Sequence, residues 1–232
     1  MSNGVSTSLF HPQDRIQVFS NVRIADGSKN RGSEARTTTP PISSTAVTIS
    51  GWKVQEIAGR MVEISGRHGS ARLTAAFCLV LDAQMHREPT AWVTLPESTY
   101  YPPDAAEFGV DLSALPVIRA PDGSMAVRAA EELVRSGAFG LIVMDLGREK
   151  SISMALQTRI LGLAQKHDTA VVFLTEKQTE EESLSSLISL RAEASTLRIG
   201  TGYSLNIHII KDKRKGPGRV YQEECCGPAG LH

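Results

Sequence analysis

The sequence has few cysteines, few aromatic residues and no excess of charge. Its three cysteines, Cys78, Cys225 and Cys226, form no C-x-x-C pair and no cluster with histidine. A disulfide framework and a zinc site are therefore excluded, and a reducing compartment is favoured. Lys plus Arg and Asp plus Glu number 25 each. This balance excludes a protein that is basic throughout, so any DNA contact needs a local basic patch.

Long apolar runs and a targeting segment are missing too. The first ten residues lack a basic region followed by an apolar run, and no stretch reaches the ~20 apolar residues of a spanning helix. These absences predict a cytoplasmic protein without membrane contact. Aromatic residues make up only 5% of the chain, which leaves few platforms on which single-stranded bases could stack.

Composition divides the chain into three parts. Residues 1–45 are rich in Ser, Thr, Gly, Pro and charge, apart from a short strand-like run at 16–19. They predict a flexible arm, because such a segment buries too little apolar area to offset its backbone entropy. A terminal remnant without a role is the alternative. Residues 46–226 predict a folded core and residues 227–232 a short tail.

Within the core, short apolar runs alternate with helical patterns. The runs are nearly continuous, which is typical of parallel strands covered on both faces. The sequence therefore predicts an α/β fold with a mainly parallel sheet flanked by helices. The expected strands are 60–65, 91–95, 116–119, 141–145 and 170–174; the expected helices follow residue 70 and span 100–108, 122–135 and 153–166.

The end of the chain predicts an antiparallel hairpin. Residues 204–210 alternate between apolar and polar, and the pattern resumes at 219–222 after a Gly/Pro turn. Around this turn lies the densest basic patch of the chain. Contact with nucleic-acid phosphates, contact with an acidic partner and a merely solvated loop tip all remain open. The patch comprises Lys211, Lys213, Arg214, Lys215 and Arg219.

A strand, a glycine-initiated loop and a helix follow one another at 60–80, which is the context of the phosphate-binding motif G-x-x-x-x-G-K-[ST]. Only the first glycine of the motif is kept. Ala71 adds a Cβ where backbone must approach phosphates, and Arg72 replaces a compact ammonium by a planar fork. Leu73 lacks the hydroxyl that would ligate Mg²⁺. The loop reads Gly66, Arg67, His68, Gly69, Ser70, Ala71, Arg72, Leu73.

These losses predict a loop without hydrolytic activity, since phosphoryl transfer depends on positioning and on metal neutralisation. Asp145 ends a buried strand where a second metal-binding acid, the Walker B acid, belongs. A helix cap or an ion-pair partner is the alternative for this carboxylate. We therefore expect no catalytic residues, no metal and no cofactor. An unusual ATPase that uses Arg72, Asp145 and Glu97 is the competing hypothesis.

Four segments, in order between about 51 and 225, give the chain a family resemblance. Residues 59–66, 108–115, 135–145 and 206–213 are similar to successive segments of RecA-type recombinases. The resemblance implies a RecA-like core. This sequence also departs from the recombinase pattern. Thr175-Glu176 stands where the recombinases have an Asn-Gln pair that senses the γ-phosphate. The catalytic glutamate of the family has only Glu97, which follows Pro96, as its counterpart.

The loop that grips DNA in these recombinases is represented here by residues 177–183, which include three consecutive acids. Such acids disfavour a DNA backbone. Acids that stabilise the start of a helix are the other interpretation.

A RecA core without its ATP and DNA parts is similar to the ImuA family, the degenerate RecA-like accessory proteins of damage-induced mutagenesis in bacteria. The resemblance implies a non-catalytic role in error-prone translesion synthesis during the SOS response. The implied partners are an ImuB-like Y-family polymerase homologue, an error-prone replicative-type DNA polymerase and RecA itself. Contact with DNA would be weak or indirect, with recruitment to the nucleoid. The division inhibitor SulA also resembles such a core and is the alternative.

Overall fold

The computed structural model describes residues 17–19, 49–67, 69–98, 100–147, 152–199 and 202–225. The expected arm at 1–45, apart from 17–19, and the expected tail at 227–232 lie outside these residues. Within the described ranges, no helix is both long and apolar enough to cross a membrane.

The described residues form one nine-stranded sheet. Its strands are β1 (Gln17–Phe19), β2 (Met61–Ser65), β3 (Thr90–Thr94), β4 (Val117–Arg119), β5 (Leu141–Gly147), β6 (Ala170–Thr175), β7 (Leu190–Ile199), β8 (Gly202–Asp212) and β9 (Val220–Cys225). They lie in the order β1-β4-β3-β5-β6-β2-β7-β8-β9. The strands from β4 to β7 are parallel, whereas β1 joins one edge antiparallel and β8 and β9 extend the other edge antiparallel.

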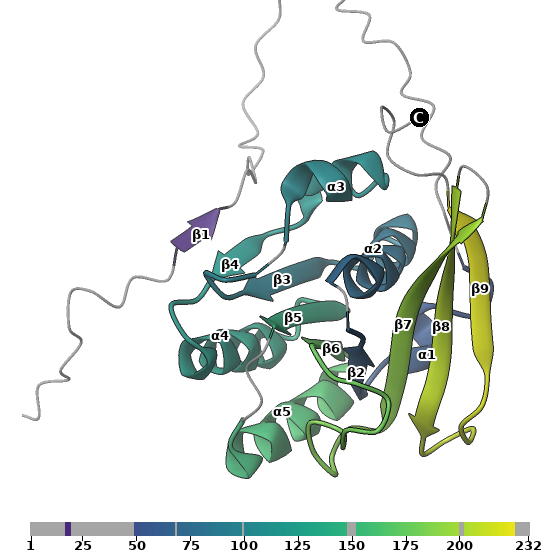
Figure 1. Cartoon of the computed structure of the whole chain (residues 1–232). Coiled ribbons are helices and arrows are strands. Elements are labelled where there is room, and N and C mark those ends of the chain that lie inside the picture. The colour runs from purple at the N-terminus through teal and green to yellow at the C-terminus, as the bar shows by residue number, and fades with distance from the viewer. Residues whose placement is uncertain are drawn as a thin grey trace, which may run out of the picture.

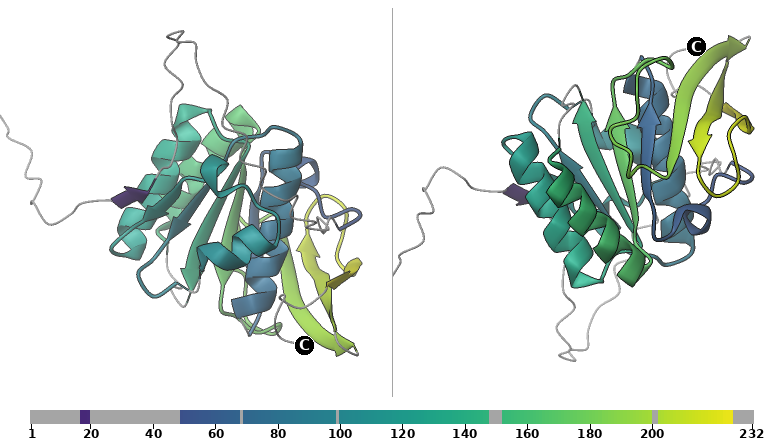
Figure 2. Two further views of the ribbon diagram at one scale, coloured as in Figure 1. Left: turned by 90° about the horizontal axis from the view of Figure 1, so that it is seen from above. Right: turned by 90° about the horizontal axis from the view of Figure 1, so that it is seen from below.

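Helices cover both faces of the parallel part. They are α1 (Val54–Ile57), α2 (Gly69–Met85), α3 (Pro102–Glu107), α4 (Gly123–Ser136) and α5 (Met154–His167), with a short 3-10 helix η1 (Leu112–Ala114). The two views of Figure 2 show α2 and α3 on one face and α4 and α5 on the other. Strands β7 to β9 form a curved unit at one side of the molecule (Figure 1).

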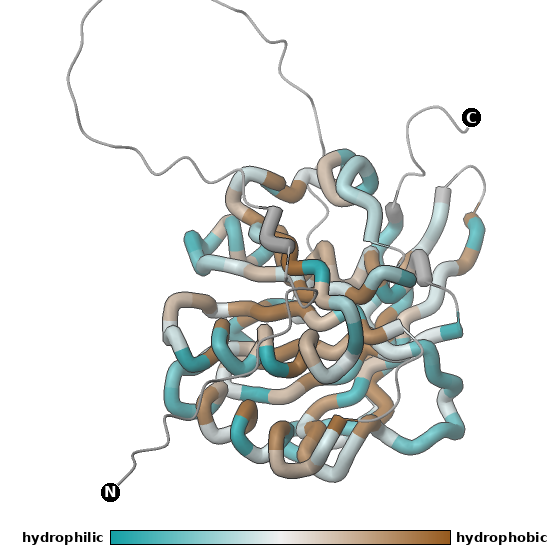
Figure 3. Tube along the Cα trace, turned by 90° about the vertical axis from the view of Figure 1, so that its left-hand side faces the viewer, coloured by the Kyte–Doolittle hydropathy of each residue, from teal (hydrophilic) through white to brown (hydrophobic). Residues whose placement is uncertain are grey.

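The two-sided burial explains the continuous apolar runs. Along β5, Leu141 and Val143 belong to the core under α2, while Ile142 and Met144 belong to the core under α4 and α5. All four side chains have no exposed surface. Figure 3 shows the apolar residues gathered along the central strands. The prediction of an α/β fold with a mainly parallel sheet and a C-terminal antiparallel hairpin is confirmed.

Polar capping residues and a glycine set the helix boundaries that the sequence predicts. The side chain of Asp122 accepts a hydrogen bond from the backbone amide of Met125 at 2.9 Å, which caps the start of α4. Gly137, with φ of 66°, ends the same helix in the left-handed conformation that favours glycine. Ser153 caps α5 by accepting from the amide of Leu156.

Two features differ from the sequence analysis. Strand β7 is not foreseen, so the C-terminal unit has three antiparallel strands rather than two. Its inner half is buried and its residues from Ser195 to Ile199 are exposed, and Arg191 interrupts the apolar pattern. The interpretation of the acids at 180–182 as a helix start is wrong, because the residues between β6 and β7 form no helix.

A buried ion pair fastens the C-terminal unit to the parallel sheet. The guanidinium of Arg60, just before β2, donates to the carboxylate of Asp212 at 2.6 Å and to the hydroxyl of Ser189 at 2.9 Å. Both side chains of the ion pair are almost fully buried. Arg219 donates to the second oxygen of Asp212. The end of β8 is therefore tied to the starts of β2 and β7.

These contacts determine the ionisation of Asp212. Burial alone would raise its pKa, but hydrogen bonds from the Arg214 amide, Arg60 and Arg219 outweigh burial and lower the pKa from 3.8 to about 2. Because the native pKa lies below the unfolded one, the stabilisation is complete above about pH 4 and is lost as the pH falls toward about 2.

We predict that Asp212→Asn lowers the free energy of unfolding by about 3 kcal/mol at pH 7, because it leaves the buried Arg60 charge without its counter-ion. Urea denaturation measures the loss. The variant should also lose less stability than the natural chain between pH 4 and pH 2.

The matched control is Glu107→Gln, which removes an equal charge from an exposed side chain and should change stability by less than about 0.5 kcal/mol. Equal unfolding midpoints for Asp212→Asn and the natural chain would contradict the proposed fastening.

Candidate functional site

The carboxyl ends of β2, β5 and β6 meet at one edge of the sheet, beside the start of α2 (Figure 1). In the parallel register Ser65 pairs with Thr175, and Asp145 pairs with Leu174. The structure thus brings together the loop after β2 and Asp145, as the sequence predicts. Of the loop itself, His68 lies outside the described residues, and the side chain of Ser70 is not described.

Gly66 is required by a close approach of two backbone segments. A Cβ at this position would lie 2.6 Å from the carbonyl oxygen of Ala194 in β7, which is shorter than real Cβ contacts allow. The first glycine of the motif is therefore kept by contact with β7, whatever else the loop binds.

The guanidinium of Arg72 is directed at acceptors of the protein itself. Its side chain is 3% exposed. Its Nη1 donates to the carbonyl oxygens of Gly66 at 2.8 Å and Thr175 at 3.1 Å, and its Nη2 lies 3.3 Å from the carboxylate of Glu176. Arg72 thus bridges the loop after β2 and the end of β6. Its charge is already balanced inside the protein.

The neighbours of Arg72 on α2 are packing residues. Ala71 and Leu73 are buried and belong to the apolar core under α2. Leu73 fills the position of the metal-binding hydroxyl with a side chain that has no oxygen. The residues present therefore do not fit a magnesium ion held in the manner of the phosphate-binding motif.

Asp145 is also satisfied within the protein. It is 3% exposed and accepts a hydrogen bond from the hydroxyl of Ser98. Burial raises its pKa, while the Ser98 hydrogen bond and the Arg72 charge oppose the rise. Ser98 in turn accepts from the amide of Tyr100 at 3.0 Å. Glu97, the other candidate acid, has an exposed side chain.

The residues from 176 to 189, here called the connecting segment, are tied to a buried carboxylate. Glu63 of β2 has no exposed surface. It accepts from Thr175 Oγ1 at 2.8 Å and from the Leu184 amide at 2.8 Å, and its carboxylate lies 3.3 Å from Lys177 Nζ. Lys177 also donates to the carbonyl of Glu182 at 3.0 Å. Glu63 thereby fixes the chain to β2 on both sides of the acids at 180–182.

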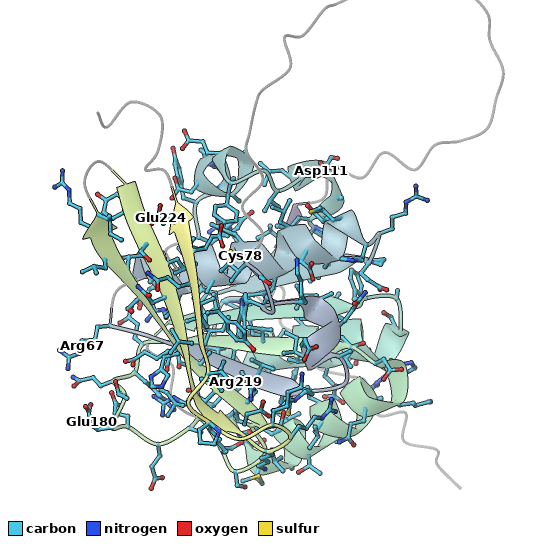
Figure 4. All side chains as sticks on the ribbon, turned by 90° about the vertical axis from the view of Figure 1, so that its right-hand side faces the viewer. Arg67, Cys78, Asp111, Glu180, Arg219 and Glu224 are labelled. Carbon is cyan, nitrogen blue, oxygen red and sulfur yellow. The ribbon has the colours of Figure 1, made fainter. Side chains whose placement is uncertain are left out.

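Two arginines hold the middle of the connecting segment. Arg191, which is 2% exposed, donates to the carbonyls of Gln178, at 2.7 Å, and Glu181. Arg67, from the loop after β2, donates to the side chain of Gln178 at 3.2 Å. Figure 4 shows Arg67 and Glu180 at the same side of the molecule. The acids at 180–182 therefore lie in a segment whose backbone is held by several hydrogen bonds.

The predicted basic patch makes many contacts within the chain. Arg219 donates to Asp212 and to the Gly216 carbonyl, at 3.0 Å, and its place in the turn is visible in Figure 4. Lys213 donates to the Ser186 carbonyl, and Lys215 pairs with Glu56.

The other two members of the patch differ. Arg214 is exposed, and burial, followed by the charge of Lys213, lowers the pKa of Lys211. Of the five basic residues, Arg219 and Lys215 are paired with carboxylates of the chain, so fewer charges are free to attract phosphates than the sequence suggests.

Several residues that shape this site are absent from the sequence-based candidates. They are charged residues inside strands, namely Glu63 and Arg191, together with Ser98 and Lys177. A carboxylate in the otherwise apolar run Met61–Ser65 is the signal that could have marked Glu63, because a buried charge requires a partner.

Comparison with known proteins gives consistent matches. The RecA N-terminal domain family matches residues 26–148. Protein RecA of Chlorobium chlorochromatii is 29% identical over 214 residues, which cover 84% of this chain and 59% of that relative. Protein RecA of Kineococcus radiotolerans is 39% identical over 197 residues, which cover 68% of this chain and 56% of the relative.

The chain thus spans little more than half the length of these relatives. The family match includes the strand, loop and helix that carry Arg72 and extends past Asp145. Since that match covers more than half of the chain, the chain belongs to the RecA N-terminal domain family.

Proposed function

We propose that this RecA-like chain is a non-catalytic accessory protein of damage-induced mutagenesis, of the ImuA type. It keeps the family's core as a surface for protein contacts and does not hydrolyse ATP. Its partners are an ImuB-like Y-family polymerase homologue, an error-prone replicative-type DNA polymerase and RecA.

One observation carries this proposal. At the position of the motif's lysine, Arg72 is buried and bonded to Gly66, Thr175 and Glu176. Binding a phosphate there would require breaking these bonds and bringing further negative charge beside Glu176. The apolar Leu73 offers no ligand to the metal that would neutralise that charge. These features favour a protein whose RecA-like fold serves protein contacts and not ATP hydrolysis.

The acidic connecting segment supports the same proposal. A DNA-gripping loop needs donors or positive charge toward the phosphates. Here the acids at 180–182 follow the buried Lys177, whose charge faces Glu63. The contacts of the basic turn with Asp212 and Glu56 also favour weak or indirect contact with DNA.

We predict that the purified chain binds ATP with Mg²⁺ more weakly than about 100 μM, which corresponds to less than ~5.5 kcal/mol of binding free energy. Isothermal titration measures the binding, and phosphate release measures turnover. Protein RecA of Chlorobium chlorochromatii serves as the positive control. Steady turnover by the natural chain that disappears in Asp145→Asn would contradict the non-catalytic proposal and revive the ATPase hypothesis.

Arg72→Ala should lower the free energy of unfolding by about 2 kcal/mol, because it leaves the buried carbonyls of Gly66 and Thr175 without donors. The midpoint of urea denaturation measures the effect. Arg128→Ala is the control, since Arg128 is exposed on α4 and its loss should cost less than about 0.5 kcal/mol. Equal stabilities of the two variants would show that Arg72 is not structural.

The adaptor role predicts association without nucleotide. Immobilised full-length chain should retain the polymerase homologue, the polymerase or RecA equally well with and without Mg-ATP, because the loop has no nucleotide-dependent state. Association that requires ATP, or no association with any of the three, would contradict the role. Filamentous growth of bacteria on overexpression would instead favour the division-inhibitor alternative.

A further inference from the structure

Glu176 places a negative charge beside the cation of the loop. Its carboxylate lies 3.3 Å from Arg72 Nη2, and its amide donates to the Gly147 carbonyl at 2.9 Å. The Glu176 side chain is 29% exposed, whereas that of Arg72 is 3% exposed. The anion therefore sits at the outer side of the cation, between Arg72 and solvent.

A loop cation at a sheet edge needs a counter-ion, because an unpaired charge in a buried place is costly. In a phosphate-binding loop, the ligand supplies the negative charge. In this chain the counter-charge comes from residue 176, at the end of β6. The cation is thus satisfied whether or not a ligand is present.

The same residue begins the connecting segment. Its next two residues are both anchored, Lys177 to Glu63 and Gln178 to Arg191 and Arg67. The amide of Gln178 also donates to the Glu181 side chain at 3.0 Å, and the amide of Leu184 donates to Glu63. The Arg72–Glu176 contact is therefore the first of a continuous series of anchors that runs from the loop to residue 184.

We propose that Glu176 is an internal substitute for a ligand phosphate, and that its contact with Arg72 holds the connecting segment in one arrangement without nucleotide. This inference rests on the non-catalytic function proposed above and adds a conformational device to it. A carboxylate of the chain itself thus supplies the negative charge beside Arg72 and fixes the start of the connecting segment.

Hydrogen exchange of the full chain, followed by mass spectrometry, tests the device. In the natural chain, peptides covering 176–189 should exchange slowly, and Mg-ATP should leave the rates unchanged. Glu176→Gln, which keeps the side-chain size but removes the charge, should speed exchange in these peptides by about tenfold, because the first anchor is weakened.

Glu182→Gln is the matched control. It removes the same charge from the same segment, but the Glu182 side chain is exposed. The contact of Glu182 with Lys177 is made by its backbone carbonyl, which the substitution keeps. Exchange in this variant should stay within about twofold of the natural rates.

Inorganic phosphate provides a second measurement. Glu176→Ala removes the carboxylate and opens its space, so excess phosphate should bind beside Arg72 and restore slow exchange in the connecting segment. Phosphate should have no such effect on the natural chain, where the place is occupied, and potassium chloride at equal ionic strength controls for screening.

Three results would overturn the inference: natural rates in Glu176→Gln, a change of natural rates on adding Mg-ATP, or faster exchange in Glu176→Ala that phosphate does not reverse. Natural rates in Glu176→Gln would leave the non-catalytic function standing, provided that the natural chain still fails to turn over ATP. Turnover by the natural chain would remove that function independently of the exchange rates.

Discussion

The interaction on which the loop end of the molecule depends is the set of bonds around the Arg72 guanidinium. A buried arginine must find acceptors, and here they come from the loop after β2 and from the end of β6. Because these strands are neighbours in the sheet, the arginine couples the start of α2 to the connecting segment. A side chain at the place of a ligand-binding lysine thus serves as a link between two structural elements.

A second link lies at the opposite end of the sheet's parallel strands, where β2 begins. Arg60 and Asp212 join the start of β2 to the end of β8, and Glu63 and Arg191 lie between the two links. Each of these side chains is buried and hydrogen-bonded, so the charged residues of β2 and β7 form bonds across an otherwise apolar sheet. The C-terminal strands are therefore an integral part of the sheet, and the connecting segment has a defined path along it.

The sequence predicts the parallel sheet, the main helices and the hairpin because each depends on local pattern. Apolar runs such as 141–145 mark strands, and Asp122 and Gly137 mark the ends of α4. Strand β7 escapes prediction because it has one buried and one exposed half, and because Arg191 interrupts its apolar run and finds its acceptors outside the strand. Arg72 is a similar case. The sequence shows that it departs from the motif, but only the structure shows which carbonyls and which carboxylate its guanidinium contacts. The lysines and arginines of the basic turn similarly look free until their partners at Glu56 and Asp212 are placed in space.

The close approach of Gly66 to Ala194 has an evolutionary consequence. A variant given lysine at position 72 and threonine at position 73 would still have the β7 backbone in close contact with Gly66 and a carboxylate beside its cation. On the proposed function, ATP hydrolysis would require several changes in separate elements, in the loop, at the end of β6 and in β7. Divergence of this kind is hard to reverse, because each single substitution leaves the other obstacles in place.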